Sequence, residues 1–242
     1  MPGAPWEAPG APAMSSKPLT DLALRALGLF QAFLLALAPA LGQTSEAGAG
    51  THYDVDRQDS WIRIYVYRAG LLSFLGHDHL ISTSVIDGGL TYTPPPALDA
   101  AFRLTIPVDA LVVDDPEQRK QVGGRFSGLV PDKDRKGTRR NMLSAKILDA
   151  AHYPEIEITG HWTGSLPSRG EVAASIGLGD THRQYRVPVD IRGQPARWVV
   201  TGSLHLEQSD LGITPVSIGG GLLKVADGVD VRFSLAFVPT EN

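Results

Sequence analysis

Alternation of apolar and polar residues is the feature that most constrains how this chain folds. It recurs from SWIRIYVYR, beginning at residue 60, to VDVRFSLAFV, ending at residue 238. Successive side chains of a β-strand point to opposite faces, so this pattern predicts strands with one buried face and one polar face. The expected inward-facing sets are Ile62, Ile64 and Val66; Ile156, Ile158 and Trp162; Val172, Ala174, Ile176 and Leu178; Tyr185, Val187, Val189 and Ile191; Trp198, Val200, Leu204 and Leu206; and Val231, Phe233, Leu235 and Phe237.

Two further stretches, HLISTSVIDGGLTY and AAFRLTIPV, raise the expected total to about eight strands. Short turns rich in Gly, Pro and Asp join them, which favours an antiparallel sandwich or barrel. A barrel of about eight strands is either filled by its side chains or holds one small ligand, and the pattern leaves both states open. Gly88-Gly89 predicts a bulge or a sharp bend, and Pro188 predicts an edge or a bulge.

The alternation stops between residues 114 and 150, where one or two helices are expected. DDPEQRKQ has an acidic start and places Pro116 in a first helical turn. GTRRNMLSAKILDAAHYP places apolar residues at helical spacing between a candidate cap at Thr138 and Pro154. These residues are Met142, Leu143, Ile147 and Leu148.

The N-terminus carries an apolar run, ALGLFQAFLLALAPALG, behind Arg25. A membrane-spanning helix needs about 20 apolar residues, so this interrupted run instead predicts a signal peptide over residues 1–42. Residues 43–50 then form a linker, and residues 51–240 form the barrel domain. The expected location is periplasmic or secreted, an uncleaved anchor is the alternative, and Met14 is an alternative start.

Composition excludes several classes of protein. The chain has no cysteine, a net charge of −4 and a pI near 6.0. A disulfide framework and a thiolate metal site are therefore excluded, and a nucleic-acid partner is not expected. No Gly-x-Ser-x-Gly elbow is present, and the glycine-rich SIGGGLLK and VGGRF lack the spacing of phosphate-binding loops. We expect a protein without enzymatic activity and without a cofactor.

His77 and His79, in GHDH, are the candidates for a polar site because they would share one strand face. Such a pair supplies two of the three protein ligands of a catalytic zinc, but the sequence shows no third ligand. Two alternatives remain: a hydrogen-bonded turn at the barrel rim, or contact with a polar headgroup or quinone ring at the mouth of an apolar pocket. His161 and His205 are expected to face outward.

The helical insertion is rich in cations. They are Arg119, Lys120, Arg125, Lys133, Arg135, Lys136, Arg139, Arg140 and Lys146. One interpretation is a solvated helix face. The other is transient contact with an anionic membrane surface, where each cation contributes about 1 kcal/mol.

Several motifs resemble the YceI-like family, which comprises secreted, lipocalin-like bacterial proteins, some of which bind polyisoprenoid lipids inside a β-barrel. The resemblance covers residues 51–238 and includes DSWIRIYVYRAG, FRLTIPVDALVVDD, QSDLGI and VADGVDVRFSLAFV. Its most specific part is Met142, Leu143, Leu148, Asp149, Tyr153, Pro154 and Ile156. Asp59 replaces the family's usual histidine, and GHDHLI replaces a Gly-x-Phe segment, so the chain resembles a divergent, GHDH-containing branch.

The resemblance implies an all-β fold: an extended antiparallel lipocalin-like barrel with a helix beside an opening. It also implies an apolar ligand, isoprenoid or lipid-like, that is carried or sequestered inside. The alternatives are a metal-binding protein or metal-dependent enzyme using His77 and His79, and a filled barrel that serves as an interaction module. The expected ligand-binding residues are Ile62, Ile64, Val66, His77, His79, Met142, Ile158, Val187 and Phe233.

Removing residues 1–42 should leave a soluble, folded protein, because every patterned strand begins after residue 50. Circular dichroism with thermal melting measures this, and we expect a cooperative β-sheet transition. A truncated chain without that transition would show that the fold includes part of residues 1–42.

Overall fold

The alternating segments form a continuous system of strands in the computed structural model, which describes residues 50–95, 98–162 and 166–240. The strands are β1 (Thr51–Val55), β2 (Trp61–Ala69), β3 (His79–Thr83), β4 (Asp87–Thr93), β5 (Asp99–Pro107), β6 (Val112–Val113), β7 (Glu155–Trp162), β8 (Ser168–Leu178), β9 (Thr181–Gln194), β10 (Arg197–Glu207), β11 (Ser217–Ile218) and β12 (Leu223–Pro239). The predicted signal peptide and residues 43–49 of the predicted linker lie outside the described residues.

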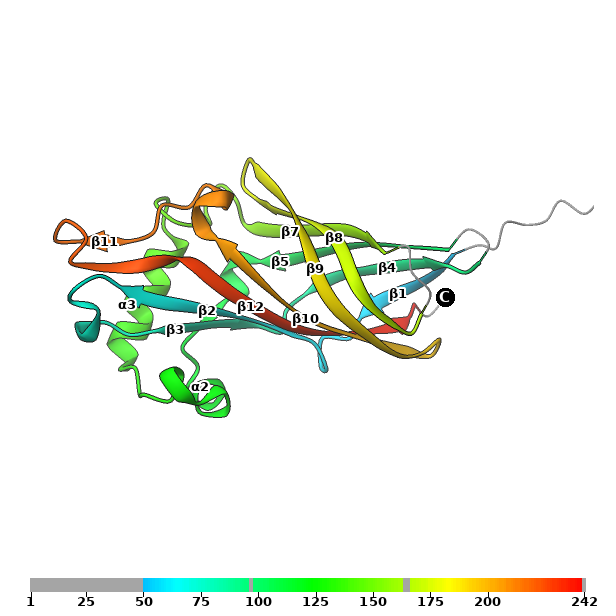
Figure 1. Cartoon of the computed structure of the whole chain (residues 1–242), viewed down its shortest axis with the longest axis horizontal. Helices are drawn as coiled ribbons and strands as arrows, with labels where there is room; N and C mark the ends of the chain where they lie inside the picture. The colour runs from blue at the N-terminus through cyan, green and yellow to red at the C-terminus, as the bar shows by residue number, and fades with distance from the viewer. Residues whose placement is uncertain (1–49, 96–97, 163–165, 241–242) are drawn as a thin grey trace, which may run out of the picture. The chain divides into compact units, whose positions relative to one another are not determined.

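Pairing between the first and last strands closes the sheet into a barrel. The order β1-β4-β5-β7-β8-β9-β10-β12 returns to β1 through the pairs Tyr53↔Pro239 and Val55↔Phe237. All of these pairings are antiparallel. The result is a closed antiparallel barrel of eight strands, which confirms the predicted fold class (Figure 1).

Three of the barrel positions are occupied by two consecutive short strands. Strand β12 pairs with β1 near its C-terminal end and with β2 over Lys224–Ser234. Strand β2 pairs with β3, which in turn pairs with β6. Each of these positions is therefore shared by two strands that follow one another along it: β1 and β2 at the first, β3 and β4 at the second, and β5 and β6 at the third. This continuation extends the wall beyond β1 and β4 toward the loops that follow β2 and β11.

The glycine and proline predictions have a clear structural outcome. Gly88 has φ +97, and a side chain there would collide with the backbone of Arg103. The β4–β5 register is continuous through Gly88, so these glycines allow a bend and a close approach and do not form a bulge. The β9–β10 ladder stops at Val189↔Gly202, next to Pro188, which confirms an edge position for this proline.

The insertion contains two α-helices, α2 (Pro116–Val122) and α3 (Asp132–Leu143), and the short 3-10 helices η2 (Val108–Ala110) and η3 (Gly124–Phe126) lie beside them. Pro116 is at the start of α2, as predicted, and the Asp115 side chain caps the helix by accepting from the Gln118 amide at 2.9 Å. None of the described helices is long and apolar enough to cross a membrane.

The predicted boundaries of the second helix were wrong. Helix α3 begins at Asp132, so Thr138 is internal and does not cap it. Asp132 and Asp134 lie in the first turn, where acidic side chains interact favourably with the helix dipole. The helix ends at Leu143 because Ser144 has extended backbone angles, and its hydroxyl donates to the Asn141 carbonyl at 2.7 Å. Ile147 and Leu148 therefore reach the core from turns.

Candidate functional site

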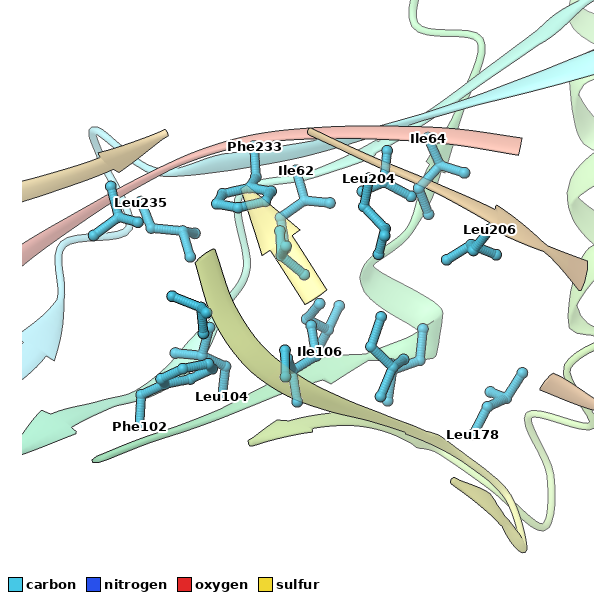
Figure 2. A pocket seen from close by; sticks show the side chains of 18 of the residues that line it. Ile62, Ile64, Phe102, Leu104, Ile106, Leu178, Leu204, Leu206, Phe233 and Leu235 are labelled. Carbon is cyan, nitrogen blue, oxygen red and sulfur yellow. The ribbon is translucent and has the colours of Figure 1, made fainter. Parts of the chain in front are cut away.

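A cavity of about 270 Å³ lies inside the barrel, and its wall is almost entirely apolar. Figure 2 shows Ile62, Ile64 and Phe233 pointing into this space, with side chains of β5 pointing toward them from the other side. Gln208 is the one polar residue among the described residues of the lining, and its side-chain amide donates to the Ala226 carbonyl at 2.8 Å. The interior therefore offers dispersion contacts and excludes charged groups.

Most predicted binding residues line this cavity. They are Ile62, Ile64, Val66, Met142, Ile158, Val187 and Phe233. Each strand residue comes from an alternating segment, so the pattern that closes the barrel also supplies the lining. Met142 comes from the last turn of α3 and, with Ile147 and Leu148 from the following turns, adds an apolar contribution from outside the strands.

Leu211 and Ile213 line the cavity but were missed in the sequence. They flank Gly212, whose φ of +78 ends the 3-10 helix η4 (Gln208–Leu211). The QSDLGI segment was noted only as typical of the family. Continued spacing of leucines and isoleucines after β10 was the available signal, but it was obscured by the intervening polar residues.

Two tryptophans lie at the end of the lining that is far from η4 and close to the β1–β12 pairing. Trp198 pairs with Phe237, and Trp162 ends β7 opposite Ala100. Both side chains are buried, and neither indole nitrogen has a hydrogen-bond partner among the described residues. This end of the cavity therefore makes only apolar contacts, although the two indole N–H groups of the tryptophans lie within its wall.

One part of the wall is not joined by a strand ladder. Beyond Val189↔Gly202, residues 181–188 of β9 pair only with β8, and residues 203–207 of β10 pair only with β12. Helix η4 lies across this unpaired stretch, and Arg183 Nε donates to the Asp210 carbonyl at 2.7 Å. Side-chain packing and this hydrogen bond replace the backbone ladder there.

The two histidines of GHDH do not line the cavity. His77 is exposed, and its side chain makes no hydrogen bond within the described residues. His79 is partly buried, and its Nδ1 lies 2.6 Å from Oδ2 of Asp114. No group of three or more His, Asp or Glu residues in the described chain is arranged to hold a metal ion. His161 and His205 are exposed, which confirms that they face outward.

Asp78 and Asp114 are the centres of a polar cluster on the outer face of the barrel. The Asp78 carboxylate accepts from the Arg68 amide and from the Arg125 side chain, at 2.9 and 2.9–3.0 Å. Asp114 accepts from the Leu80 amide at 2.8 Å and from the buried Arg119 at 2.5 Å. These contacts hold β3, α2 and η3 together.

The ion pairs keep both aspartates ionised. Burial alone would raise the pKa of Asp114, but its contacts with His79, the Leu80 amide and Arg119 outweigh that effect and lower the pKa below its usual value. Burial acts in the same way on Asp78, and the hydrogen bonds from Arg125 and the Arg68 amide likewise lower its pKa. The cluster covers a small outer core of Tyr65, Leu80 and Phe126.

Comparison with known families matches residues 53–237 to the YceI-like domain. The chain belongs to the YceI-like family. Comparison of the sequence with curated proteins gave no match.

Two solved structures show the same fold as this YceI-like chain. BcnA of Burkholderia cenocepacia is 16% identical, has a TM-score of 0.53, and aligns over 76% of this chain and 99% of its own. A polyisoprenoid-binding domain of Saccharophagus degradans, implicated in plant cell wall breakdown, is 14% identical with a TM-score of 0.53, over 78% of this chain and 99% of its own. At these identities the likeness concerns the fold alone.

The basic insertion of this YceI-like chain divides into two groups. Arg119 is buried against Asp114, and Arg125 is paired with Asp78, so both belong to the polar cluster. On α3, Lys136 and Arg135 contact Asp132, and Arg139 donates to the Asp109 carbonyl at 2.7 Å. Arg119 therefore cannot contact a membrane surface, whereas the exposed cations of α3 retain that role as a prediction.

Replacing Asp114 with Asn should strongly destabilise the fold, because Arg119 would become a buried cation without a counter-ion. We expect the free energy of unfolding at neutral pH, measured by urea titration, to fall by about 3–5 kcal/mol. The lowered pKa means that the wild-type carboxylate stabilises the fold above its ordinary pKa of 3.8 and loses this effect as pH falls through the folded value. The difference in unfolding free energy between wild type and Asp114→Asn should therefore become smaller in acid.

His77→Ala is the matched control, because it changes the same GHDH segment at an exposed position. Its unfolding free energy should stay within about 0.5 kcal/mol of wild type. Equal losses in the two variants would contradict a stabilising role centred on Asp114.

Proposed function

We propose that this protein binds one elongated apolar molecule, isoprenoid or lipid-like, inside the barrel and carries or sequesters it. The observation that supports this most directly is the apolar lining of the 270 Å³ cavity. That volume lies just below the usual range of small-molecule sites, which measure about 300–1,000 Å³. The polyisoprenoid-binding description of the Saccharophagus domain is consistent with the same class of ligand.

The dimensions of the lining favour a chain-like ligand. Residues of β12 contribute to it from Val229 to Phe237, which corresponds to about 27 Å of strand at about 3.4 Å per residue. A volume of 270 Å³ bounded over that length is narrow. An extended hydrocarbon fits such a space better than a bulky fused-ring system does.

We further propose that residues 1–42 are a signal peptide, that residues 51–240 are one barrel domain, and that the protein is periplasmic or secreted. We expect no enzymatic activity, no cofactor and no nucleic-acid partner. The GHDH segment as the mark of a divergent branch stays a prediction, as does a modest contribution of His77 and His79 to ligand affinity.

The metal-binding alternative is separated from this proposal by elemental analysis of protein purified without chelator. We expect less than about 0.2 equivalents of zinc, copper or iron, because a catalytic zinc normally has three protein ligands and GHDH offers two. About one equivalent of metal, lost in His77→Ala, would favour the alternative.

Organic extraction of the purified protein, followed by mass spectrometry, tests the ligand directly. In Ile64→Trp, the indole would occupy part of the cavity, at a cost of about 1–3 kcal/mol if it crowds its neighbours. We expect this variant to remain folded and to lose the extracted lipid. Ser203→Trp is the control, because Ser203 is exposed between the cavity residue Leu204 and Gly202, and it should retain the lipid.

A filled barrel would give a different result. Wild-type extracts would then contain no lipid, and Ile64→Trp would be markedly destabilised because no space would accept the indole. That pair of outcomes would favour the interaction-module alternative over a carrier.

A further inference from the structure

Two adjacent loops expose an unusual number of apolar side chains. One follows β2 and contains the 3-10 helix η1 (Ser73–Leu75), where Leu71, Phe74 and Leu75 are 82%, 69% and 65% exposed. The other, residues 216–222, comprises β11 with the residue before it and the turn that leads into β12, and it exposes Val216, Ile218 and Leu222. We call residues 70–76 and 216–222 together the apolar tip. Figure 1 shows both loops at the same end of β2 and β12.

Backbone contacts make the apolar tip one surface. The Leu72 amide donates to the Leu222 carbonyl at 2.7 Å, and Ala69 pairs with Lys224. Gly70 packs directly against the backbone of Gly221 and Leu222, an approach that a side chain would block. The two loops are therefore held together, and no element of the described part of the chain covers their apolar side chains.

The apolar tip carries no charged side chain, and two cations border it. Residues 69–76 and 211–223 contain no Asp or Glu, and Arg68 and Lys224 border the two loops; the Arg68 side chain also lies 3.9 Å from the buried carboxylate of Asp78. Exposed apolar patches of this kind mark interaction sites. Apolar side chains with bordering cations suit the interface of a bilayer that contains anionic lipid, where both the hydrocarbon and the headgroups contribute to binding.

The apolar tip continues directly from the cavity wall. Val66 on β2 and Val229 on β12 line the cavity and pair with each other, and the same two strands run on into the two loops. In Figure 1, α3 lies toward this end of the barrel, and its Lys133, Lys136 and Arg140 are exposed. The surface therefore lies on the same two strands as the cavity residues Val66 and Val229, beyond them toward the strand ends.

We propose that the apolar tip inserts into the interface of a lipid bilayer and docks the barrel there. Docking itself depends only on side chains outside the cavity. Its consequence, transfer of the ligand between bilayer and cavity, rests on the proposed function.

A fluorescent probe in the full chain tests the insertion. The chain has no cysteine, so Ile218→Cys gives a single labelling site for an environment-sensitive nitrobenzoxadiazole dye. With vesicles of equal parts phosphatidylglycerol and phosphatidylethanolamine, we expect a blue shift and strong quenching by spin-labelled lipid. Leu129→Cys is the matched control, because Leu129 is 80% exposed but lies between η3 and α3, and its dye should be quenched much less. Equal quenching at both sites, or none at either, would overturn the proposal.

A second variant identifies the contributing residues. Adding Phe74→Ser and Leu75→Ser to the Ile218→Cys protein should weaken vesicle binding, read from dye quenching against lipid concentration, by about tenfold or more. Tenfold corresponds to about 1.4 kcal/mol, which two side chains of this size readily supply on leaving water. Unchanged binding would overturn the proposal, including the case in which the tip instead contacts a protein partner.

Lipid extraction distinguishes failure of docking from failure of the proposed function. The Phe74→Ser, Leu75→Ser protein retains the whole cavity lining and should still hold lipid acquired during expression. Wild-type protein without any lipid would contradict the proposed function, whatever the vesicle result. Wild-type protein that holds lipid, combined with no quenching of the dye in Ile218→Cys, would contradict docking alone.

Discussion

The pairing of β1 with β12 is the constraint on which the remainder of the structure depends. It joins the two ends of the domain through Tyr53, Val55 and Phe237 and removes the open edges that a sheet of this length would otherwise present. It also encloses the apolar faces of all the other strands. If the sheet were open, those faces would meet water along one side, and no interior cavity would exist.

Closure of the barrel has two opposing effects on the stability of the fold. Apolar side chains stabilise the fold by leaving water, yet the space between them is not filled. If the relation between cavity volume and stability found for core truncations applied here, about 24 cal/mol per Å³, an empty space of 270 Å³ would cost on the order of 6 kcal/mol. An apolar ligand recovers contacts that the protein side chains do not make with one another, which gives binding a physical basis without any polar group.

Sequence reasoning succeeded where a local rule determines the outcome. Strict alternation predicts which residues face inward, and Ile62, Ile158 and Val187 do line the interior. Pro116 and Pro188 were interpreted correctly because proline restricts the backbone in a fixed way. The family resemblance supplied the barrel, which alternation alone could not separate from a sandwich.

Sequence reasoning failed where residues far apart in the chain determine the structure. Helix α3 begins six residues before Thr138, since acidic side chains and a preceding proline favoured an earlier start. Three of the partners of GHDH, Asp114, Arg119 and Arg125, lie 35 to 47 residues away in sequence, so no spacing rule connects them. Leu211 and Ile213 enter the cavity only because η4 crosses between two strands.

That crossing has a kinetic consequence. Because the stretch of wall between residues 181–188 of β9 and 203–207 of β10 is bridged by η4 and not by a ladder, it can widen there by breaking the Arg183–Asp210 hydrogen bond and local packing, with every strand pairing intact. Local openings of this kind cost less free energy than global unfolding. Under the proposed function, the residence time of a bound molecule would then depend on the mobility of one short helix, and exchange would not require the barrel to unfold.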